Sequence, residues 1–84
     1  MFDLFASSTL TMTRLKVNSP TILSVGYEPD AEVLELEFPG STVYEYHKVN
    51  PLIYMGLMYT DSKGAYFNNH IKDKYDYTLL REGK

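Results

Sequence analysis

The sequence predicts an α+β domain, built from a three-stranded antiparallel β-meander, with or without an additional N-terminal strand, followed by two short helices. Residues 32–38 alternate apolar and acidic side chains, which is typical of a strand with one buried face. Asn50 and Pro51 have the form of a helix start, with Asn as N-cap and Pro in the first turn. Apolar residues then recur at helical spacing between residues 65 and 75.

Length and composition limit the chain to one small domain. With 84 residues it buries only roughly 60–65% of its unfolded surface, and scaffolds of this size often need disulfides, metals or oligomerisation. The absence of cysteine excludes disulfides and thiolate metal sites, and the two histidines lie in no metal-ligand pattern, so no metal or other cofactor is expected. Self-association as a dimer or tetramer is therefore expected.

The charge pattern disfavours general affinity for nucleic acid. Eight Lys and Arg stand against 11 Asp and Glu, giving a net charge of −3, whereas such affinity needs many contacts from cations to phosphates. No apolar run approaches the roughly 20 residues of a membrane span, and Asp3 stands where a signal peptide would carry positive charge. The protein is expected in the cytoplasm of a bacterium or a phage-infected cell.

Three strands are expected over residues 21–28, 32–38 and 42–49, separated by turns that contain Pro29 and Pro39-Gly40. The inward sets are expected to be Leu23, Val25 and Tyr27, then Leu34, Leu36 and Phe38, with Glu35 and Glu37 facing outward. In the third strand Tyr44 and Tyr46 share one face, and Val43, Glu45 and His47 share the other.

The flanking segments are less regular. Residues 1–16 are expected to form an N-terminal arm or strand, with a change of alternation near Arg14 that indicates a bulge or an edge. Residues 17–77 form the expected domain, and residues 78–84 are expected to be a C-terminal tail, although Tyr75, Tyr77 and Leu79 alternate as in a short final strand.

The first helix, over residues 52–59, is apolar on nearly all sides and is expected to be buried or to face another subunit. Asp61 or Ser62 can cap the second helix, over residues 65–74. Phe67, Ile71 and Tyr75 form one stripe along it.

This ordered series of motifs resembles the KTSC domain family, which is found at the C-terminus of some lysyl-tRNA synthetases and as a small free-standing protein in bacteria and phages. The residues that carry the resemblance, over 17–77, are Val17, Ser19, Ile22, Val25-Gly26-Tyr27, Leu34, Leu36, Phe38, Gly40, Tyr44, Tyr46, Val49-Asn50-Pro51, Ser62, Gly64, Phe67-Asn68, Ile71 and Tyr75. Pro20 and Thr60 depart from the pattern, at positions where the family has Ser and Ala. The resemblance implies a binding role, with RNA as the partner suggested by the synthetase context.

No catalytic motif is present: the chain has no cysteine, no Gly-x-Ser-x-Gly turn and no glycine-rich phosphate loop, so it is not expected to be an enzyme. Ligand-binding residues are expected instead where rings, amides and cations can meet. The set is Tyr44, Tyr46, Ser62, Lys63, Tyr66 and Asn68, with Arg14, Lys16 or Lys72 from the same or a neighbouring subunit. The alternatives are core packing for the tyrosines and a capped helix with a solvated Lys63 for the turn.

Three functions follow from these patterns. The first is a non-enzymatic protein that captures a small nucleotide-type ligand between subunits, for example a cyclic dinucleotide immune signal that a phage protein would sequester. Few cations suffice for that role, so the net charge of −3 does not oppose it. The second is an RNA-binding module, and the third is a protein-interaction domain without a ligand.

Overall fold

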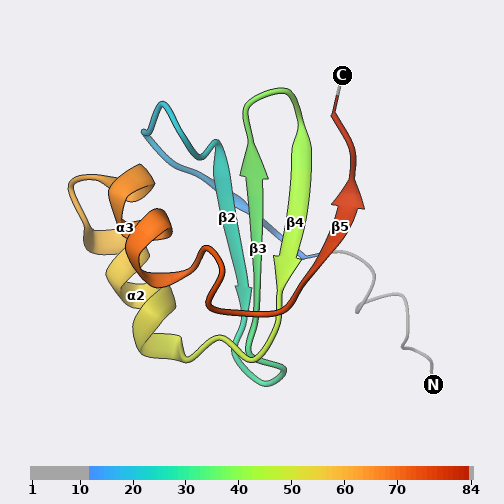
Figure 1. The fold of residues 1–84 in the computed structure, drawn as a ribbon, viewed down its shortest axis with the longest axis vertical. Coiled ribbons are helices and arrows are strands. Elements are labelled where there is room, and N and C mark those ends of the chain that lie inside the picture. Colours follow the sequence, from blue (N-terminus) through green and yellow to red (C-terminus); the bar gives the residue numbers. More distant parts are fainter. Residues whose placement is uncertain (1–11, 84) are drawn as a thin grey trace.

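The computed structural model describes residues 12–83 as one antiparallel sheet with two helices on one of its faces (Figure 1). The strands are β1 (Leu15–Lys16), β2 (Ser24–Glu28), β3 (Val33–Phe38), β4 (Thr42–Tyr46) and β5 (Tyr77–Arg81). The helices α2 (Pro51–Tyr59) and α3 (Lys63–His70) lie between β4 and β5 in the chain. The sheet order is β1-β2-β3-β4-β5 with every pair antiparallel, which confirms the predicted meander and adds a strand at each edge.

The central strand β3 explains which side chains form the core. Leu36 lies opposite Val25 of β2 and Tyr44 of β4, and Leu34 lies opposite Tyr27 and Tyr46. Because residues opposite one another point to the same face, these side chains all lie on the helix-bearing face of the sheet. The buried core consists of Ile22, Val25, Leu34, Leu36, Tyr46, Val49, Leu57, Phe67 and Ile71.

Two predictions about the sheet were wrong. Leu23 was expected to point inward, but β2 begins only at Ser24, so Ile22 is buried and Leu23 is 38% exposed. Glu35 was expected to face solvent, and it does lie on the outer face, but it is buried there. Its carboxylate pairs with the Arg14 guanidinium, and the Arg14 Nε donates to Ser24 Oγ at 3.0 Å.

Glycine at position 26 lets the segment before β1 lie directly on β2. A Cβ atom there would be 2.8 Å from Met12 Sδ and 3.0 Å from Arg14 Cγ. β1 is an edge strand, as expected from the irregular alternation near Arg14, although it is only two residues long. Residues 1–11 of the expected arm lie outside the described residues.

The helix α2 begins where the sequence predicts, with the Asn50 side chain accepting from Leu52 N at 2.8 Å and Pro51 in the first turn. Leu57 is its one buried residue, so the expectation that α2 is buried within the fold is wrong, while contact with another subunit stays a prediction. Leu52, Met55 and Tyr59 form an exposed stripe along the helix, at 71%, 47% and 83% exposure.

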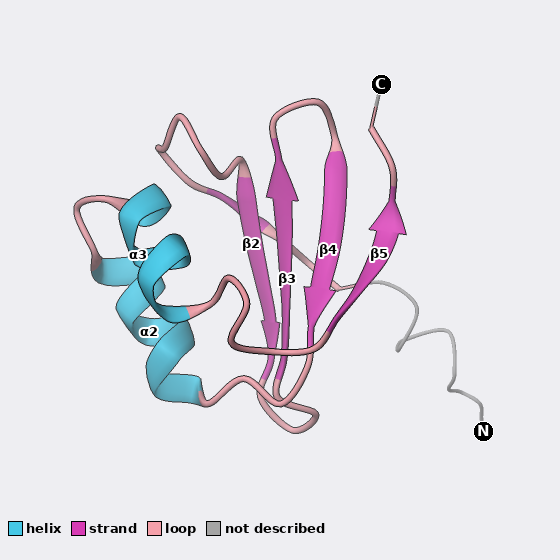
Figure 2. Ribbon diagram, in the orientation of Figure 1, coloured by secondary structure: helices cyan, strands magenta, loops and turns pink. Residues whose placement is uncertain are grey.

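The helix α3 is capped by Ser62, whose Oγ accepts from Ala65 N at 3.4 Å. It ends at His70, four residues before the expected end at residue 74. Asp73 has φ of 62°, a left-handed conformation that an α-helix cannot continue through. The chain therefore turns back toward the sheet at residues 71–74 (Figure 2).

The strand β5 occupies much of the segment that was expected to be a tail. It pairs with β4, placing Tyr77 opposite Tyr46 and Leu79 opposite Tyr44, with a register shift at Val43/Tyr44. The expected alternation of Tyr77 and Leu79 is confirmed, but residues 78–81 are part of the sheet. Neither helix of the described residues is long and apolar enough to cross a bilayer.

Candidate functional site

A hollow of about 270 Å³ lies on the helix-bearing face of the sheet, over β4 and β5. The helices cover the β2 side of that face and leave β4 and β5 without a helix above them (Figure 2). We call this hollow the aromatic pocket. It is lined by Phe38, Tyr44, Tyr46, Phe67, Lys72, Asp73 and Tyr77.

Five of these side chains form a continuous network of rings. The Tyr44 ring lies 5.4 Å from the Tyr77 ring and 5.9 Å from the Phe38 ring, measured between centroids, in edge-to-face contacts. Phe67 joins the network from α3, with its centroid 5.3 Å from that of Phe38 and 5.9 Å from that of Tyr46. Edge-to-face contacts fix the ring orientations. The pocket is therefore a shaped surface with exposed ring area, since Tyr77 is 61% exposed.

Tyr46 and Phe67 are the two buried members of the network, and only Tyr46 carries a hydroxyl. The pKa of its hydroxyl is raised to about 12, by burial first and then by the neighbouring Tyr44, Tyr77 and Asp73. Within residues 12–83 the Tyr46 hydroxyl makes no hydrogen bond to another side chain or carbonyl. A neutral hydroxyl can therefore donate to a ligand in the pocket.

The charged groups of the pocket, Lys72 and Asp73, come from the turn after α3. Lys72 N donates to Phe67 O at 2.8 Å, and Lys74 N donates to Ile71 O at 3.0 Å. These two backbone bonds enclose Asp73, which holds its left-handed conformation between them. The turn therefore presents one cation and one carboxylate at the pocket from a hydrogen-bonded backbone.

The expected site residues are thus only partly brought together. Tyr44, Tyr46 and Lys72 line the aromatic pocket. Ser62 and Lys63 line a separate polar cleft of about 250 Å³ between residues 18–21 and the start of α3.

Lys63 is not the solvated cation that either sequence interpretation required. Its Nζ donates to Leu57 O at 2.9 Å and to Met58 O at 3.2 Å, so it caps the carbonyl end of α2. Ser62 Oγ is likewise engaged as the N-cap of α3. A phosphate at this turn would have to compete with the bonds that hold both helices.

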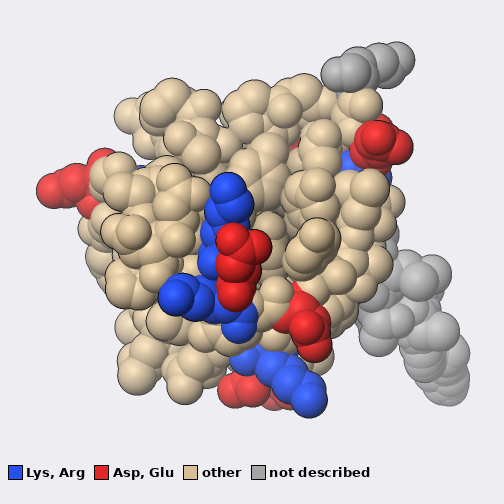
Figure 3. All heavy atoms as spheres, in the orientation of Figure 1, with Lys and Arg blue, Asp and Glu red and all other residues tan. Residues whose placement is uncertain are grey.

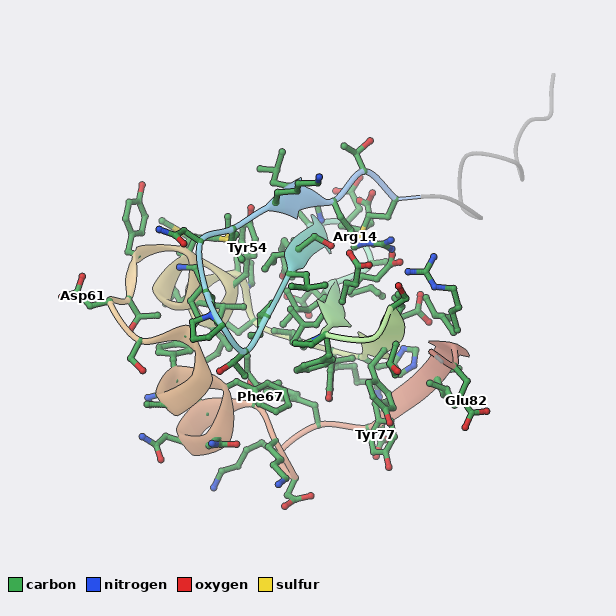
Figure 4. All side chains as sticks on the ribbon, turned by 90° about the horizontal axis from the view of Figure 1, so that it is seen from above. Arg14, Tyr54, Asp61, Phe67, Tyr77 and Glu82 are labelled. Atoms are coloured by element: carbon green, nitrogen blue, oxygen red, sulfur yellow. The ribbon has the colours of Figure 1, made fainter. Side chains whose placement is uncertain are left out.

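The remaining expected residues lie away from the pocket. Arg14 is on the opposite side of the sheet from Phe67 and Tyr77 (Figure 4), paired with Glu35. Lys16 is exposed on β1, at the opposite edge of the sheet from β5. Tyr66 packs between the helices and donates from Oη to Ile53 O at 3.1 Å, and Asn68 is exposed and lines neither hollow.

Sequence reasoning missed four lining residues: Phe38, Phe67, Asp73 and Tyr77. Tyr77 was recognisable as a strand residue. It lies beside Tyr46 only because β5 pairs with β4, and the two helices separate these strands in the sequence. Phe38 and Phe67 were assigned to the core, and both also reach it. Asp73 carries no local signal of a binding role.

The face that bears the α3–β5 connection is largely uncharged, with Lys, Arg, Asp and Glu in a narrow mixed band across its middle and at its margins (Figure 3). No group of three or more potential metal ligands is assembled in residues 12–83. The chemistry available at the pocket is therefore ring stacking with one positive and one negative group beside it.

Comparison with known families identifies the fold. The model of the KTSC domain matches residues 18–75, which is most of the chain. The chain belongs to the KTSC domain family. The crystal structure of a KTSC domain protein from Yersinia pestis superposes on this domain with a TM-score of 0.81 at 35% identity, covering 84% of this chain and all of the other. The resemblance inferred from the motifs is thereby confirmed.

Two relatives differ in how much of their own length is similar to this chain. A protein of Stutzerimonas stutzeri is 34% identical over 64 residues, which is 76% of this chain and 90% of that protein. A lysine–tRNA ligase of Nostoc punctiforme is 38% identical over 66 residues, which is 79% of this chain but only 12% of the ligase.

Proposed function

We propose that this KTSC domain is a non-enzymatic binding protein that captures a small nucleotide-type ligand in the aromatic pocket. The observation that carries the proposal is the network of five rings around a partly open hollow, with Lys72 beside it. A flat base gains about 1–3 kcal/mol from stacking on an aromatic side chain. Tyr77 offers the most exposed ring for that contact.

The size of the hollow limits what one domain can hold. About 270 Å³ lies just below the roughly 300–1,000 Å³ typical of sites for drug-sized ligands. One base fits such a volume, with its sugar and phosphate extending toward Lys72. A dinucleotide, including a cyclic one, presents two bases and so needs a second pocket from a second copy of the domain.

The apolar stripe on α2 supports a second copy. Leu52, Met55 and Tyr59 are exposed on one side of a helix that the sequence predicted to need burial. A small domain gains apolar burial by association. We therefore propose a homo-oligomer, with the number of copies set by how these stripes pack.

RNA is the second candidate, because the chain is similar to a segment of a lysine–tRNA ligase. Proteins recognise single-stranded RNA by stacking unpaired bases on aromatic side chains, which the same pocket would accommodate. The net charge of −3 opposes it, since RNA affinity depends on neutralising several phosphates. The salt dependence of binding separates the two candidates.

The test is a thermal-shift panel of mono-, di- and cyclic dinucleotides and a short single-stranded RNA, on wild type and two variants. We expect a nucleotide to raise the melting temperature, with little change on going from 50 to 200 mM salt. Tyr77→Ala should weaken binding by roughly 5- to 150-fold, the equivalent of about 1–3 kcal/mol. Tyr59→Ala, which removes a ring that is 83% exposed on α2, is the matched control for mononucleotides, which occupy one pocket, and it should not weaken their binding.

Stabilisation by RNA alone, lost steeply as salt rises, would favour the RNA module. Stabilisation by tetramethylammonium but by no nucleotide would show a cation cage, because aromatic rings also attract quaternary ammonium groups. If no compound stabilises the protein, the remaining hypothesis is a protein-interaction domain without a ligand.

A further inference from the structure

The aromatic pocket carries an acceptor that nucleotide binding in general does not require. Stacking uses the rings, and a phosphate uses Lys72, but neither needs the Asp73 carboxylate. A negative group beside a site for an anionic ligand is unfavourable unless it contacts a donor on that ligand. The Asp73 carboxylate therefore indicates which ligand the pocket binds.

The Asp73 backbone is held in place, and its exposed side chain has no partner of its own. The backbone on either side is fixed by the bonds from Lys72 N and Lys74 N. Within residues 12–83, the Asp73 carboxylate makes no ion pair and accepts no hydrogen bond. It lines the pocket next to Tyr46, whose raised pKa reflects burial first, then the neighbouring tyrosines and this carboxylate.

An ionised carboxylate is an acceptor with two oxygens side by side. Among the common bases, guanine alone presents two adjacent donors on its Watson–Crick edge, the N1–H and the 2-amino group. Adenine and cytosine each present a donor beside an acceptor, and uracil presents one donor between two carbonyls. A hydrogen-bond acceptor that faces a carboxylate is repelled. The carboxylate therefore discriminates among bases by the donors and acceptors on their Watson–Crick edges.

We infer that the pocket selects guanine, with Asp73 accepting hydrogen bonds from N1–H and the 2-amino group while the rings stack on the base. The inference rests on the proposed function and specifies its ligand. A good bidentate contact discriminates against the wrong base by roughly 5- to 150-fold. That range is the expected preference for a guanine over an adenine nucleotide.

The test compares guanosine, inosine and adenosine 5′-monophosphates by isothermal titration calorimetry on the full chain. Inosine keeps N1–H but lacks the 2-amino group, so its affinity should fall between the other two. Asp73→Asn is the informative variant, because asparagine tolerates the left-handed conformation and replaces one acceptor by a donor. This variant should bind the guanine nucleotide more weakly and the adenine nucleotide more tightly, which would reverse or abolish the preference for guanine. Asp76→Asn, a nearby carboxylate outside the pocket, is the matched control and should leave the preference unchanged.

The outcomes separate this inference from the proposal on which it rests. Equal affinity of the three nucleotides, with all three weakened by Tyr77→Ala, would overturn guanine selection and leave nucleotide binding standing. A guanine preference that survives Asp73→Asn would also overturn the role of Asp73. Failure of every nucleotide to bind the wild type would refute the proposed function itself.

Discussion

The contact between Gly56 and Tyr66 predicts that alanine at position 56 destabilises the protein, although helix propensity alone predicts that it stabilises. Gly56 lies inside α2, where alanine would ordinarily stabilise by about 1 kcal/mol. A Cβ atom at this position would stand 2.1 Å from Tyr66 Oη and 2.7 Å from Tyr66 Cζ. The ring must therefore move, which breaks its hydrogen bond to Ile53 O.

The magnitude follows from three contributions. Overpacking costs about 1–3 kcal/mol, and the lost hydrogen bond costs about 1 kcal/mol. The gain in helix propensity offsets about 1 kcal/mol. Gly56→Ala should therefore lower the free energy of unfolding by about 1–3 kcal/mol, and the melting temperature by about 4–8 °C for each kcal/mol.

The measurement is urea unfolding of four proteins: wild type, Gly56→Ala, Tyr66→Ala and the double variant. In the Tyr66→Ala background the clash is absent, so adding Gly56→Ala should be neutral or stabilising by about 1 kcal/mol. Gly56→Ala as stable as wild type, or destabilisation of equal size in both backgrounds, would refute the packing of α2 on α3 described above.

Further predictions concern the outer face, alkaline pH and association. Arg14→Ala should destabilise by about 3 kcal/mol, because it leaves the buried Glu35 unpaired; Arg14→Ala with Glu35→Leu should recover most of that loss in urea unfolding. The pKa of Tyr46 rises from 10.0 to about 12 on folding, so the folded protein binds more protons between those values. The contribution of Tyr46 to the free energy of unfolding should be constant below pH 10 and then fall by up to about 1.4 kcal/mol per pH unit, so the alkaline loss of stability should be less steep in Tyr46→Phe; the pKa values of Tyr27 and Tyr66 are raised too, so some slope should persist. Sedimentation at micromolar concentration should give a dimer or tetramer, and a monomeric mass would contradict the proposed association.

The fold was predictable wherever a pattern was local. The alternation of residues 32–38 identified β3 and its two fully buried leucines, Leu34 and Leu36. Asn50 and Pro51 marked the start of α2, and the serine before Lys63 capped α3. Each of these features depends on hydrogen bonds or side-chain directions within a few residues, which the sequence contains directly.

The site was harder to predict because it depends on contacts between distant segments. The nearer contact of Lys63 was also missed: its ammonium was expected to be free, but it reaches back across the turn to the Leu57 and Met58 carbonyls at the end of α2. Arg14 was expected at a phosphate, but its side chain lies on the face of the sheet away from the helices, where it pairs with Glu35 (Figure 4). Tyr77 joins the pocket only because β5 returns to pair with β4, and that pairing has no local sequence signal.

Mapping the ligand on the protein tests the central claim most directly. In two-dimensional ¹H–¹⁵N NMR of the full chain, titration with guanosine 5′-monophosphate should shift the amide signals of β4, of residues 72–73 and of Tyr77. The amide signals of Asn18, Ser19, Thr21 and residues 62–64, which surround the separate polar cleft, should not shift. Shifts confined to the polar cleft, or no shifts at millimolar nucleotide, would contradict the assignment of the aromatic pocket as the binding site.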